Sequence, residues 1–568
     1  MRKLISILFL VLPVAGWGAT YSLPSTNVFD WAQYTGIPGG IPSRTTYTNL
    51  SAGSSVAAIQ NALDVCPTNQ AVKLLTGSTS LGGGTLTIPD FVSLRGEGFG
   101  TVLTSVGQIR MGDGNGPGSR TYITISSGAT RGSSNITVSS TPTGLSVGSV
   151  FHITELNNTN IGVNPNGYEE DITAPLLCDY CDEANPSLDG TYVRGQAVQA
   201  TAISGSDITF DPPLWTDFTE SERIEYPPSG SILGQYRGLE DIKVETSNYA
   251  TLDMDGSMYC WATNVYFHIL TGGDAALRTH WSYRCQVEHC DFKGFVNEQP
   301  TGILSWMHSF YTRIQNNSFD TITQNITMAG RGGGHAIAWN YINSETNNGF
   351  TSIISDITSH GAHNDFTLLE GNKWIKLDFD SIHGSAGRGT IFRNWGRAES
   401  LSPEGKTTYG FGAIQIDSWN WYFQCVANIL GHPGISGWGY SVESTTDQAG
   451  EEFLWVLGFS GYNPWEADNV SSRLLRHNNY DYVNGGIVDN IGGESTNHVA
   501  SLIFPSKPTW VGTLAFPAIG PDTTGLYTNQ IPAEYRFLTG NDPPAEGGSS
   551  PVGTFSGKVS VQGSAILQ

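Results

Sequence analysis

A stretch near the middle of the chain nearly repeats itself, and this repeat constrains the fold more than any other feature of the sequence. Within residues 359–394, the string HGAHNDFTLLEGN is followed by HGSAGRGTIFRN. His360 aligns with His383 and Asn372 with Asn394, at offsets of 23 and 22 residues. A repeat of this length is typical of a solenoid, in which each coil of chain stacks on the coil before it.

Asparagines recur at the ends of short apolar phrases along the same half of the chain. The phrases are RIQNNSF, AIAWNYI, LLEGNKW, IFRNWG and CVANILG, and their asparagines, spaced by 23, 32, 22 and 34 residues, are Asn317, Asn340, Asn372, Asn394 and Asn428. Asparagine tolerates the left-handed backbone conformation, and its amide can hydrogen-bond to the same amide one coil away. We therefore expect one asparagine at the same turn of successive coils, with loops inserted where the spacing is long.

The composition agrees with a turn-rich β protein. Only 14% of the 568 residues are charged, whereas 69 are glycine, and few segments keep a helical period. Length alone would suggest several domains, but repeat folds run long as single units. The formal net charge of −23 argues against nucleic acid and anionic membranes as partners.

The first 19 residues have the layout of a secretory signal peptide. Arg2 and Lys3 precede a mostly apolar run from Leu4 to Val14, and mainly small residues follow up to Ala19. This run is too short to span a bilayer permanently, and no later segment approaches ~18 uninterrupted apolar residues. The sequence therefore predicts a secreted protein, extracellular or periplasmic, without a membrane span.

The rest of the chain divides into four parts. Residues 20–120 are predicted to form the N-terminal cap and first coils, since residues 54–66 carry an amphipathic pattern at Val56, Ile59, Leu63 and Val65. Residues 121–213 alternate like hairpin strands and predict an antiparallel β insertion with a long acidic loop at 157–190. Residues 214–532 are the main coils, and residues 533–568 are predicted to be a loosely ordered tail.

The seven cysteines fit an oxidising compartment. Cys178 and Cys181 are predicted to be bridged or structural, because the sequence offers them no second ligand pair for zinc. Cys260 and Cys285 are 25 residues apart and could lie on adjacent coils.

The phrase AAIQNALDVC, followed by VKLLTGSTSL, LTIPDFVSLRGEG and GTVL, resembles the start of the parallel β-helix proteins of the pectate-lyase superfamily. Members of that superfamily are secreted and mostly act on polysaccharides, and a helix covers their first coil, where it protects an open strand edge. The resemblance implies an all-β fold, a right-handed parallel β-helix with an N-terminal capping helix. It leaves the substrate open.

Ionisable residues gather at one phase of the predicted coils. Counting back 11 or 12 residues from three of the asparagines gives His360, His383 and Asp417, which on adjacent coils would stack about 4.8 Å apart. Nearby phases add polar residues that we predict to be catalytic or to bind substrate; the former are Asp378, Asp380 and Arg388, and the latter are Arg331, His363, Trp419 and Arg393.

Two chemistries fit these residues. Hydrolysis of a glycosidic bond needs an acid and a carboxylate, which Asp378, Asp380 and Asp417 could supply. Lyase chemistry needs a cation to neutralise a uronate carboxylate and a base to remove the adjacent proton, and His360, His383, Arg388 or a calcium ion held by aspartates could supply these. Calcium is the one cofactor that the sequence brings into consideration, either here or in the acidic loop, where a solvated surface is the stronger interpretation.

The sequence therefore predicts a secreted, monomeric polysaccharide-degrading enzyme, either a lyase or a hydrolase, that binds a sugar chain across the coils. The alternative is a non-catalytic, adhesive carbohydrate-binding β-helix. A purely structural use of the same residues also stays open, since each histidine could hold a turn and Glu370 could pair with Arg393 between coils.

Overall fold

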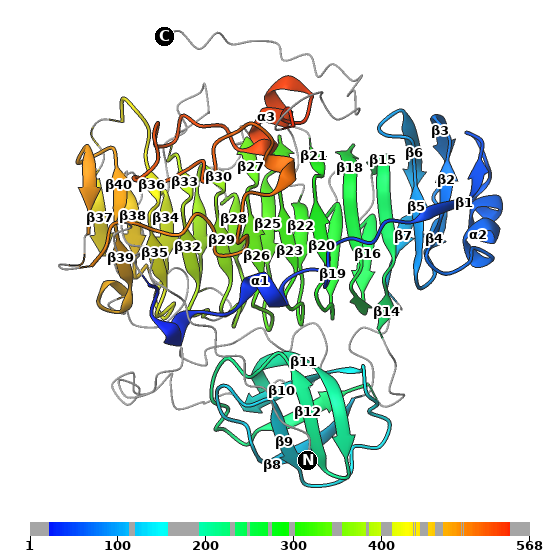
Figure 1. Cartoon of the computed structure of the whole chain (residues 1–568), viewed down its shortest axis with the longest axis horizontal. Coiled ribbons are helices and arrows are strands. Elements are labelled where there is room, and N and C mark those ends of the chain that lie inside the picture. Colours follow the sequence, from blue (N-terminus) through cyan, green and yellow to red (C-terminus); the bar gives the residue numbers. More distant parts are fainter. Residues whose placement is uncertain are drawn as a thin grey trace, which may run out of the picture.

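The computed structural model is a long solenoid of short parallel strands with a small β-barrel beside it (Figure 1). It describes residues 22–112, 120–156, 192–227, 233–246, 250–270, 275–294, 301–343, 355–381, 385–398, 412–435, 437, 439–443, 453–459, 470–489, 491 and 494–545. The predicted signal peptide, the acidic loop with Cys178 and Cys181, and His383 lie outside these residues.

The solenoid is a right-handed parallel β-helix, as predicted. One sheet, sheet B, has one strand in each coil. Its strands are β4 (Thr85–Thr87), β7 (Gln108–Arg110), β16 (Leu252–Asp255), β19 (Leu277–His280), β22 (Thr301–Ser305), β25 (Gln324–Met328), β28 (Ile357–Ser359), β31 (Leu377–Phe379), β34 (Ile414–Ile416), β38 (Phe453–Leu457) and β37 (Gly439–Glu443). Every pairing within sheet B is parallel.

The other sheet, sheet A, has two strand columns that merge where single long strands span both. The first column holds β1 (Thr45–Leu50), β2 (Gln70–Leu74), β5 (Val92–Arg95), β15 (Gly238–Thr246), β18 (Trp261–Ile269), β20 (Gln286–Glu288), β23 (Arg313–Gln315), β26 (Ala336–Ala338), β29 (Leu368–Glu370), β32 (Thr390–Phe392), β35 (Gln424–Val426) and β39 (Leu475–His477). The second holds β3 (Gly77–Ser80), β6 (Thr101–Val106), the ends of β15 and β18, β21 (Asp291–Lys293), β24 (Ser318–Asp320), β27 (Tyr341–Asn343), β30 (Lys373–Trp374), β33 (Trp395–Gly396), β36 (Ile429–Leu430) and β40 (Asn479–Asp481), with β41 (Gly486–Val488) antiparallel to β40. A short pair, β14 (Gly234–Gln235) and β17 (Ser257–Met258), lies at a turn.

The interior of the solenoid is filled by apolar side chains that repeat from coil to coil. Phe267, Phe292 and Phe319 occupy paired positions, and their rings stack at centroid distances of 4.9 and 4.8 Å. These distances match the spacing of paired strands, so each interior row is a continuous stack. Cys260 and Cys285 are likewise neighbours on adjacent coils, as predicted, and both are buried free thiols.

The predicted asparagines form one hydrogen-bonded ladder between the two columns of sheet A. Each Nδ2 donates to the Oδ1 of the next asparagine at 3.0–3.1 Å, and the ladder continues to a sixth member, Asn479, that the sequence did not predict. Each Oδ1 also accepts the backbone N–H of the preceding asparagine. The expectation that the asparagines themselves are left-handed is wrong. The positive φ angles belong to the residues just before them, such as Trp339 and Gly371. The backbone therefore changes direction one residue before each ladder asparagine.

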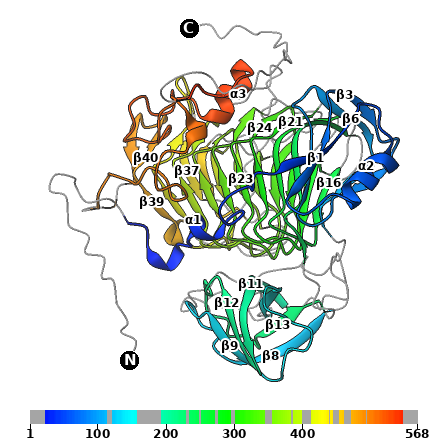
Figure 2. The ribbon, with the colours of Figure 1, turned by 45° about the vertical axis from the view of Figure 1, so that its right-hand side comes forward.

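Helix α2 (Val56–Asp64) covers the N-terminal end of the solenoid (Figure 2). The hydroxyl of Ser55 accepts the N–H of Ala58, which caps the helix, and Ile59 and Leu63 are fully buried against the first coil. Val65, which we expected on the apolar face, is 64% exposed, because it lies just past the end of the helix.

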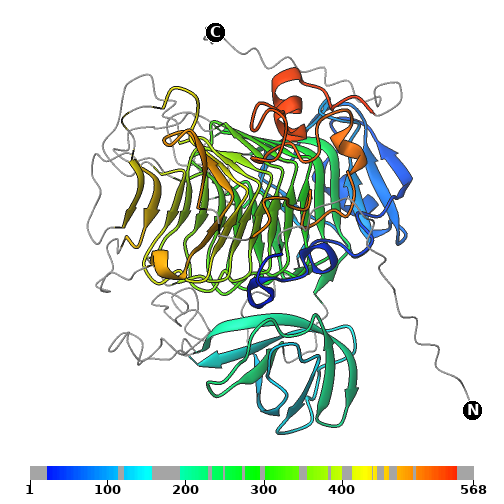
Figure 3. The same cartoon turned by 60° about the vertical axis from the view of Figure 1, so that its left-hand side comes forward.

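The antiparallel insertion is a closed six-stranded barrel (Figure 3). Its strands are β8 (Thr121–Ser127), β9 (Asn135–Val138), β10 (Val150–Leu156), β11 (Tyr192–Ser204), β12 (Asp207–Asp211) and β13 (Arg223–Tyr226). The barrel continues past the predicted boundary at residue 213, because β13 pairs with both β8 and β10 to close it. Tyr311 of the solenoid donates a hydrogen bond to the carbonyl of Ala197 at 2.9 Å, and Trp215 packs against Tyr311, so the two parts are in contact.

Short helical turns occur in the segments that run over the outside of the solenoid. They are η1 (Ser25–Asn27), α1 (Trp31–Tyr34), η4 (Val470–Arg473) and η5 (Thr509–Val511). The N-terminal segment is anchored by Trp31, whose indole N–H donates to the carbonyl of Phe366 at 2.7 Å. Within the described residues, no helix is long and apolar enough to cross a membrane.

The chain after β41 runs back along the solenoid and ends in helix α3 (Pro532–Thr539), the orange to red segment of Figure 1. The prediction of a loose tail from residue 533 is therefore wrong for residues 533–545. Arg536 is buried and donates to the carbonyl of Asn316 at 2.8 Å, and Glu534 pairs with Lys373 at 2.6 Å. These polar contacts lie in a segment whose Pro and Gly content predicted disorder. They join the tail to coils that are far away in the sequence, so no local pattern could reveal them.

We predict that Asn394→Ala lowers the free energy of unfolding by about 2–4 kcal/mol, because it leaves buried N–H and C=O groups of two coils without partners. Urea unfolding followed by fluorescence measures the change. Asn49→Ala, at an exposed position on β1, is the matched control and should stay within about 0.5 kcal/mol of the wild type. Equal stability of the two variants would show that the ladder is dispensable.

Candidate functional site

Three carboxyl groups and a histidine lie on the outer face of sheet B. Asp378 is on β31, and His360, Asp380 and Asp417 directly follow β28, β31 and β34. The register pairs Ser359 with Phe379 and Phe379 with Ile416. Phe379 and Ile416 are fully buried in the core. Side chains alternate between the faces of a strand, so the residues on either side of these two point outward. The outward set is His360, Asp378, Asp380, Gln415 and Asp417.

The structure corrects the predicted file of His360, His383 and Asp417. Asp380 is the residue that lies between His360 and Asp417 in the stack of coils. The backbone N–H of Asp380 donates to the carbonyl of Ser359, and the backbone N–H of Asp417 donates to the carbonyl of Phe379. Counting back 11 or 12 residues from each asparagine selected His383 in place of Asp380. His360, Asp380 and Asp417 in fact lie 12, 14 and 11 residues before Asn372, Asn394 and Asn428. Coils with equal ladder positions can still differ in the length of their turns.

His360 and Asp380 form an ion pair at the exposed edge of this cluster. The Nδ1 atom of His360 lies 2.6 Å from Oδ2 of Asp380, and this hydrogen bond is the main reason why the pKa of His360 is raised. The histidine side chain is 40% exposed, whereas the Asp380 side chain is 8% exposed. The ion pair therefore lies where the buried part of the cluster meets solvent.

Asp378 and Asp417 hold their protons more tightly than ordinary carboxyl groups. Burial, together with repulsion from Asp380, raises the pKa of Asp378 to about 6, although nearby Lys376 opposes the shift. Burial and repulsion from Asp378 raise the pKa of Asp417 well above its usual range, against a 2.9 Å hydrogen bond from Gln415. The cluster thus sets two carboxyl groups of raised pKa beside Asp380, which pairs with His360.

Arg388 and His363 belong to a different region, where the coils meet the barrel. His363 is buried 3.7 Å from Asp365, and Arg388 is buried between the rings of Phe366 and Tyr422. Burial, followed by repulsion from Arg194 of the barrel, lowers the pKa of Arg388 to about 10. Neither residue is part of the cluster on sheet B.

Arg331 and Trp419 are also buried away from an open face. Arg331 is 1% exposed and lies 3.7 Å from Glu225 of the barrel. Trp419 is 4% exposed and packs against Trp421 with ring centroids 5.5 Å apart. Both therefore pack within the protein instead of presenting a surface to a sugar.

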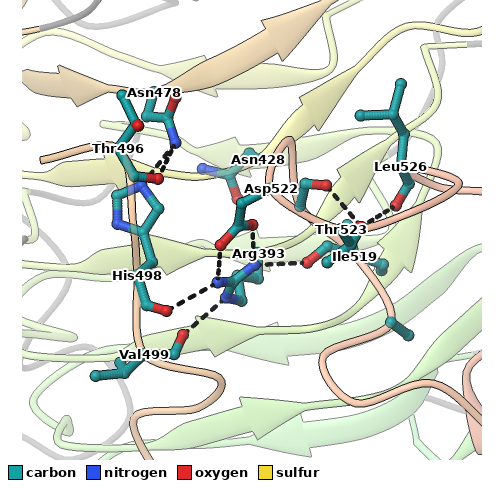
Figure 4. A network of polar contacts seen from close by, with 12 residues as sticks. Arg393, Asn428, Asn478, Thr496, His498, Val499, Ile519, Asp522, Thr523 and Leu526 are labelled. Carbon is teal, nitrogen blue, oxygen red and sulfur yellow. Dashed lines mark hydrogen bonds and ion pairs between the residues drawn. The ribbon is translucent and has the colours of Figure 1, made fainter. Parts of the chain in front are cut away.

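Arg393 anchors the C-terminal segment (Figure 4). Its guanidinium makes two 2.7 Å contacts with Asp522 and donates to the carbonyls of Val499, Ile519 and His498. Glu370 accepts the N–H of Leu502 at 2.7 Å instead of pairing with Arg393. Arg393 is therefore not part of the candidate site.

Two polar neighbours of the carboxyl groups, Lys376 and Gln415, were not predicted from the sequence. Each lies two residues before a predicted site residue, Lys376 before Asp378 and Gln415 before Asp417. The two-residue period of a strand was the signal that could have found them. A second group, His152, Glu225 and His308, was also missed, since it combines residues of the barrel and the solenoid.

No known family matches the sequence, and no curated protein matches it. Solved structures with a similar fold include the Gp54 tailspike of Acinetobacter baumannii bacteriophage AP22 in complex with a capsular saccharide, 10% identical with a TM-score of 0.37 over 75% of this chain and 69% of that chain. The tailspike gp49 of Pseudomonas phage LKA1 is 13% identical with a TM-score of 0.36 over 71% and 70%. The alginate lyase of Paenibacillus sp. FPU-7 is 9% identical with a TM-score of 0.24 over 76% and 95%. At these values the likeness carries no argument about activity.

We predict that Asp417→Asn is more stable than the wild type at pH 8 and no more stable at pH 3.5. The raised pKa means that the folded state binds more protons than the unfolded state above about pH 4, so wild-type stability falls as pH rises. The amide stays neutral and escapes this loss. Thermal unfolding across this pH range measures the difference. Asp64→Asn, at an exposed helix position, removes one carboxyl group outside the cluster and is the matched control. A pH profile of Asp417→Asn equal to that of the wild type would contradict the assignment.

Proposed function

We propose that the protein is a polysaccharide hydrolase that works outside the cell and binds a sugar chain across the outer face of sheet B. The observation that carries the proposal is a carboxyl group of raised pKa, Asp378, two residues from Asp380, whose carboxylate lies 2.6 Å from Nδ1 of His360. Glycosidases use two such groups, one to protonate the leaving oxygen and one to activate water or attack the sugar. The export pattern at the N-terminus supports the location.

Asp378 is assigned as the general acid and Asp380 as the base or nucleophile. Asp378 is partly exposed and would donate its proton to the glycosidic oxygen, while Asp380 would act on the anomeric carbon directly or through water. Asp417 is buried and acts through its neighbours as a positioning residue, since it adds to the carboxyl density that makes proton release unfavourable.

The carboxyl groups of the cluster favour hydrolysis over lyase chemistry. A lyase must neutralise a uronate carboxylate and remove the adjacent proton, and the groups predicted for these roles were His360, His383, Arg388 or a calcium ion held by aspartates. Arg388 lies at the barrel instead, and the cluster holds three carboxyl groups against His360 and Lys376.

We predict that Asp380→Asn reduces the release of reducing ends by at least about 100-fold while leaving binding to the polysaccharide intact. A panel of neutral, amino and acidic polysaccharides is incubated with each protein, and reducing ends and absorbance near 235 nm are followed. Asp320→Asn, a partly exposed carboxylate of sheet A, serves as control and should retain full activity.

Reducing ends together with the absorbance would identify a lyase and contradict the proposal. Binding without any new reducing end from the wild type would identify a non-catalytic carbohydrate-binding protein.

We also predict that kcat/KM falls as pH rises through about 6, because Asp378 must be protonated to act as the acid. Initial rates between pH 4 and pH 9 give the apparent pKa on the alkaline side. A rate that stays flat up to pH 8 would remove Asp378 from this role.

A further inference from the structure

A second cluster of ionisable side chains lies where the barrel meets the solenoid. His152 and Glu225 are directly paired residues on β10 and β13 of the barrel, and His308 lies in the turn between β22 and β23 of the solenoid. All three are at most 5% exposed. Each residue offers one atom that could bind a metal ion, and these three atoms all lie within 4.8 Å of one another. The cluster therefore joins the two parts of the chain.

The two imidazole rings lie side by side on one face of Trp281. Their centroids are 4.7 Å (His152) and 3.8 Å (His308) from the indole, with interplanar angles of 6° and 16°. Rings on opposite faces would be separated by at least about 7 Å, twice the contact distance of stacked atoms. The two imidazoles are only 5.3 Å apart, with an interplanar angle of 21°, so they share a face of the indole. Because imidazole lone pairs lie in the ring plane, both rings can direct a nitrogen to one point.

The atoms facing that point lack hydrogen-bond partners among the described residues. They are Nδ1 of His152, Nε2 of His308 and both carboxylate oxygens of Glu225, all of them buried. Nδ1 of His152 lies 3.8 Å from Oε1 of Glu225. This distance exceeds that of a hydrogen bond. Several unsatisfied buried atoms around one point call for a bound water or ion.

We infer that His152, His308 and Glu225 bind a divalent transition-metal ion, of which Zn²⁺ is the best-suited example, and that this ion fastens the barrel to the solenoid. Two imidazole nitrogens and one carboxylate oxygen are ligands that zinc accepts. Ligand atoms about 2.1 Å from a tetrahedral zinc lie about 3.4 Å apart, so small side-chain rotations close the observed gaps. Calcium prefers an all-oxygen set and does not suit these residues.

The surrounding cations are arranged so that they leave one side of the carboxylate available. Arg331 and Arg223 approach Oε2 of Glu225 at 3.7 and 3.8 Å, whereas Oε1 faces His152. The guanidinium of Arg120 lies 3.5 Å from the ring centroid of Trp281. These positive charges reduce the affinity for a dication without occupying the ligand atoms.

The test uses the full chain, stripped with EDTA and titrated with ZnCl₂. Calorimetry should give one saturable site per chain, and the Tm should rise by at least about 3 °C with Zn²⁺ but not with Ca²⁺. His308→Phe keeps a ring on Trp281 but cannot bind metal, and it should weaken zinc binding by at least 100-fold and abolish the shift in Tm. His268→Phe, a half-buried histidine on β18, is the matched control and should bind zinc like the wild type.

Several results would overturn the inference. They are the absence of a saturable zinc site in the wild type, zinc binding by His308→Phe equal to that of the wild type, or a rise in Tm with sulfate but not with zinc. The last result would assign the site to an anion held by the arginines. Should His308→Phe fail to fold, Glu225→Gln replaces it, and the same loss of zinc binding is expected. The cluster is separate from the carboxylates of sheet B, so neither outcome affects the proposed hydrolase.

Discussion

The asparagine ladder is the constraint on which the rest of the solenoid depends. Each coil has to turn a corner between the two columns of sheet A, and the corner buries backbone N–H and C=O groups that the strands do not satisfy. The side chain of each ladder asparagine accepts a backbone N–H and donates to a carbonyl and to its neighbour. The ladder therefore holds the coils in one register even where the intervals between its members range from 22 to 51 residues.

Fixed register lets residues far apart in sequence act together. His360, Asp380 and Asp417 come from three coils, and insertions between them do not disturb their phase because the strands on either side stay paired. The stacked scaffold also tolerates carboxyl groups that repel one another. Their repulsion and burial destabilise the fold above the ordinary carboxyl pKa, and the same effects keep Asp378 and Asp417 protonated to a higher pH.

Ionic contacts outside the coils serve a different purpose. Arg393, Lys373 and Arg536 are buried and hold the returning C-terminal segment against the solenoid. At the opposite junction, arginines and histidines fill the boundary with the barrel. Buried cations at these boundaries fix the position of the C-terminal segment and of the barrel on the solenoid. Moving either part away would leave a buried charge without its partner, which is energetically unfavourable.

The sequence by itself determined the solenoid, its capping helix and the ladder, because these depend on local patterns that repeat at a readable interval. Asn317 to Asn428 could be counted, whereas Asn479 could not, since 51 residues separate it from its neighbour. The sequence also named Asp378, Asp380 and Asp417 as candidates but placed His383 where Asp380 lies, because turns of unequal length break the count. Only the tertiary structure decided which charged residues meet. Arg388 and Arg331 lie against the barrel, and Arg393 lies under the C-terminal segment, because those contacts join segments separated by more than a hundred residues and no local pattern encodes them.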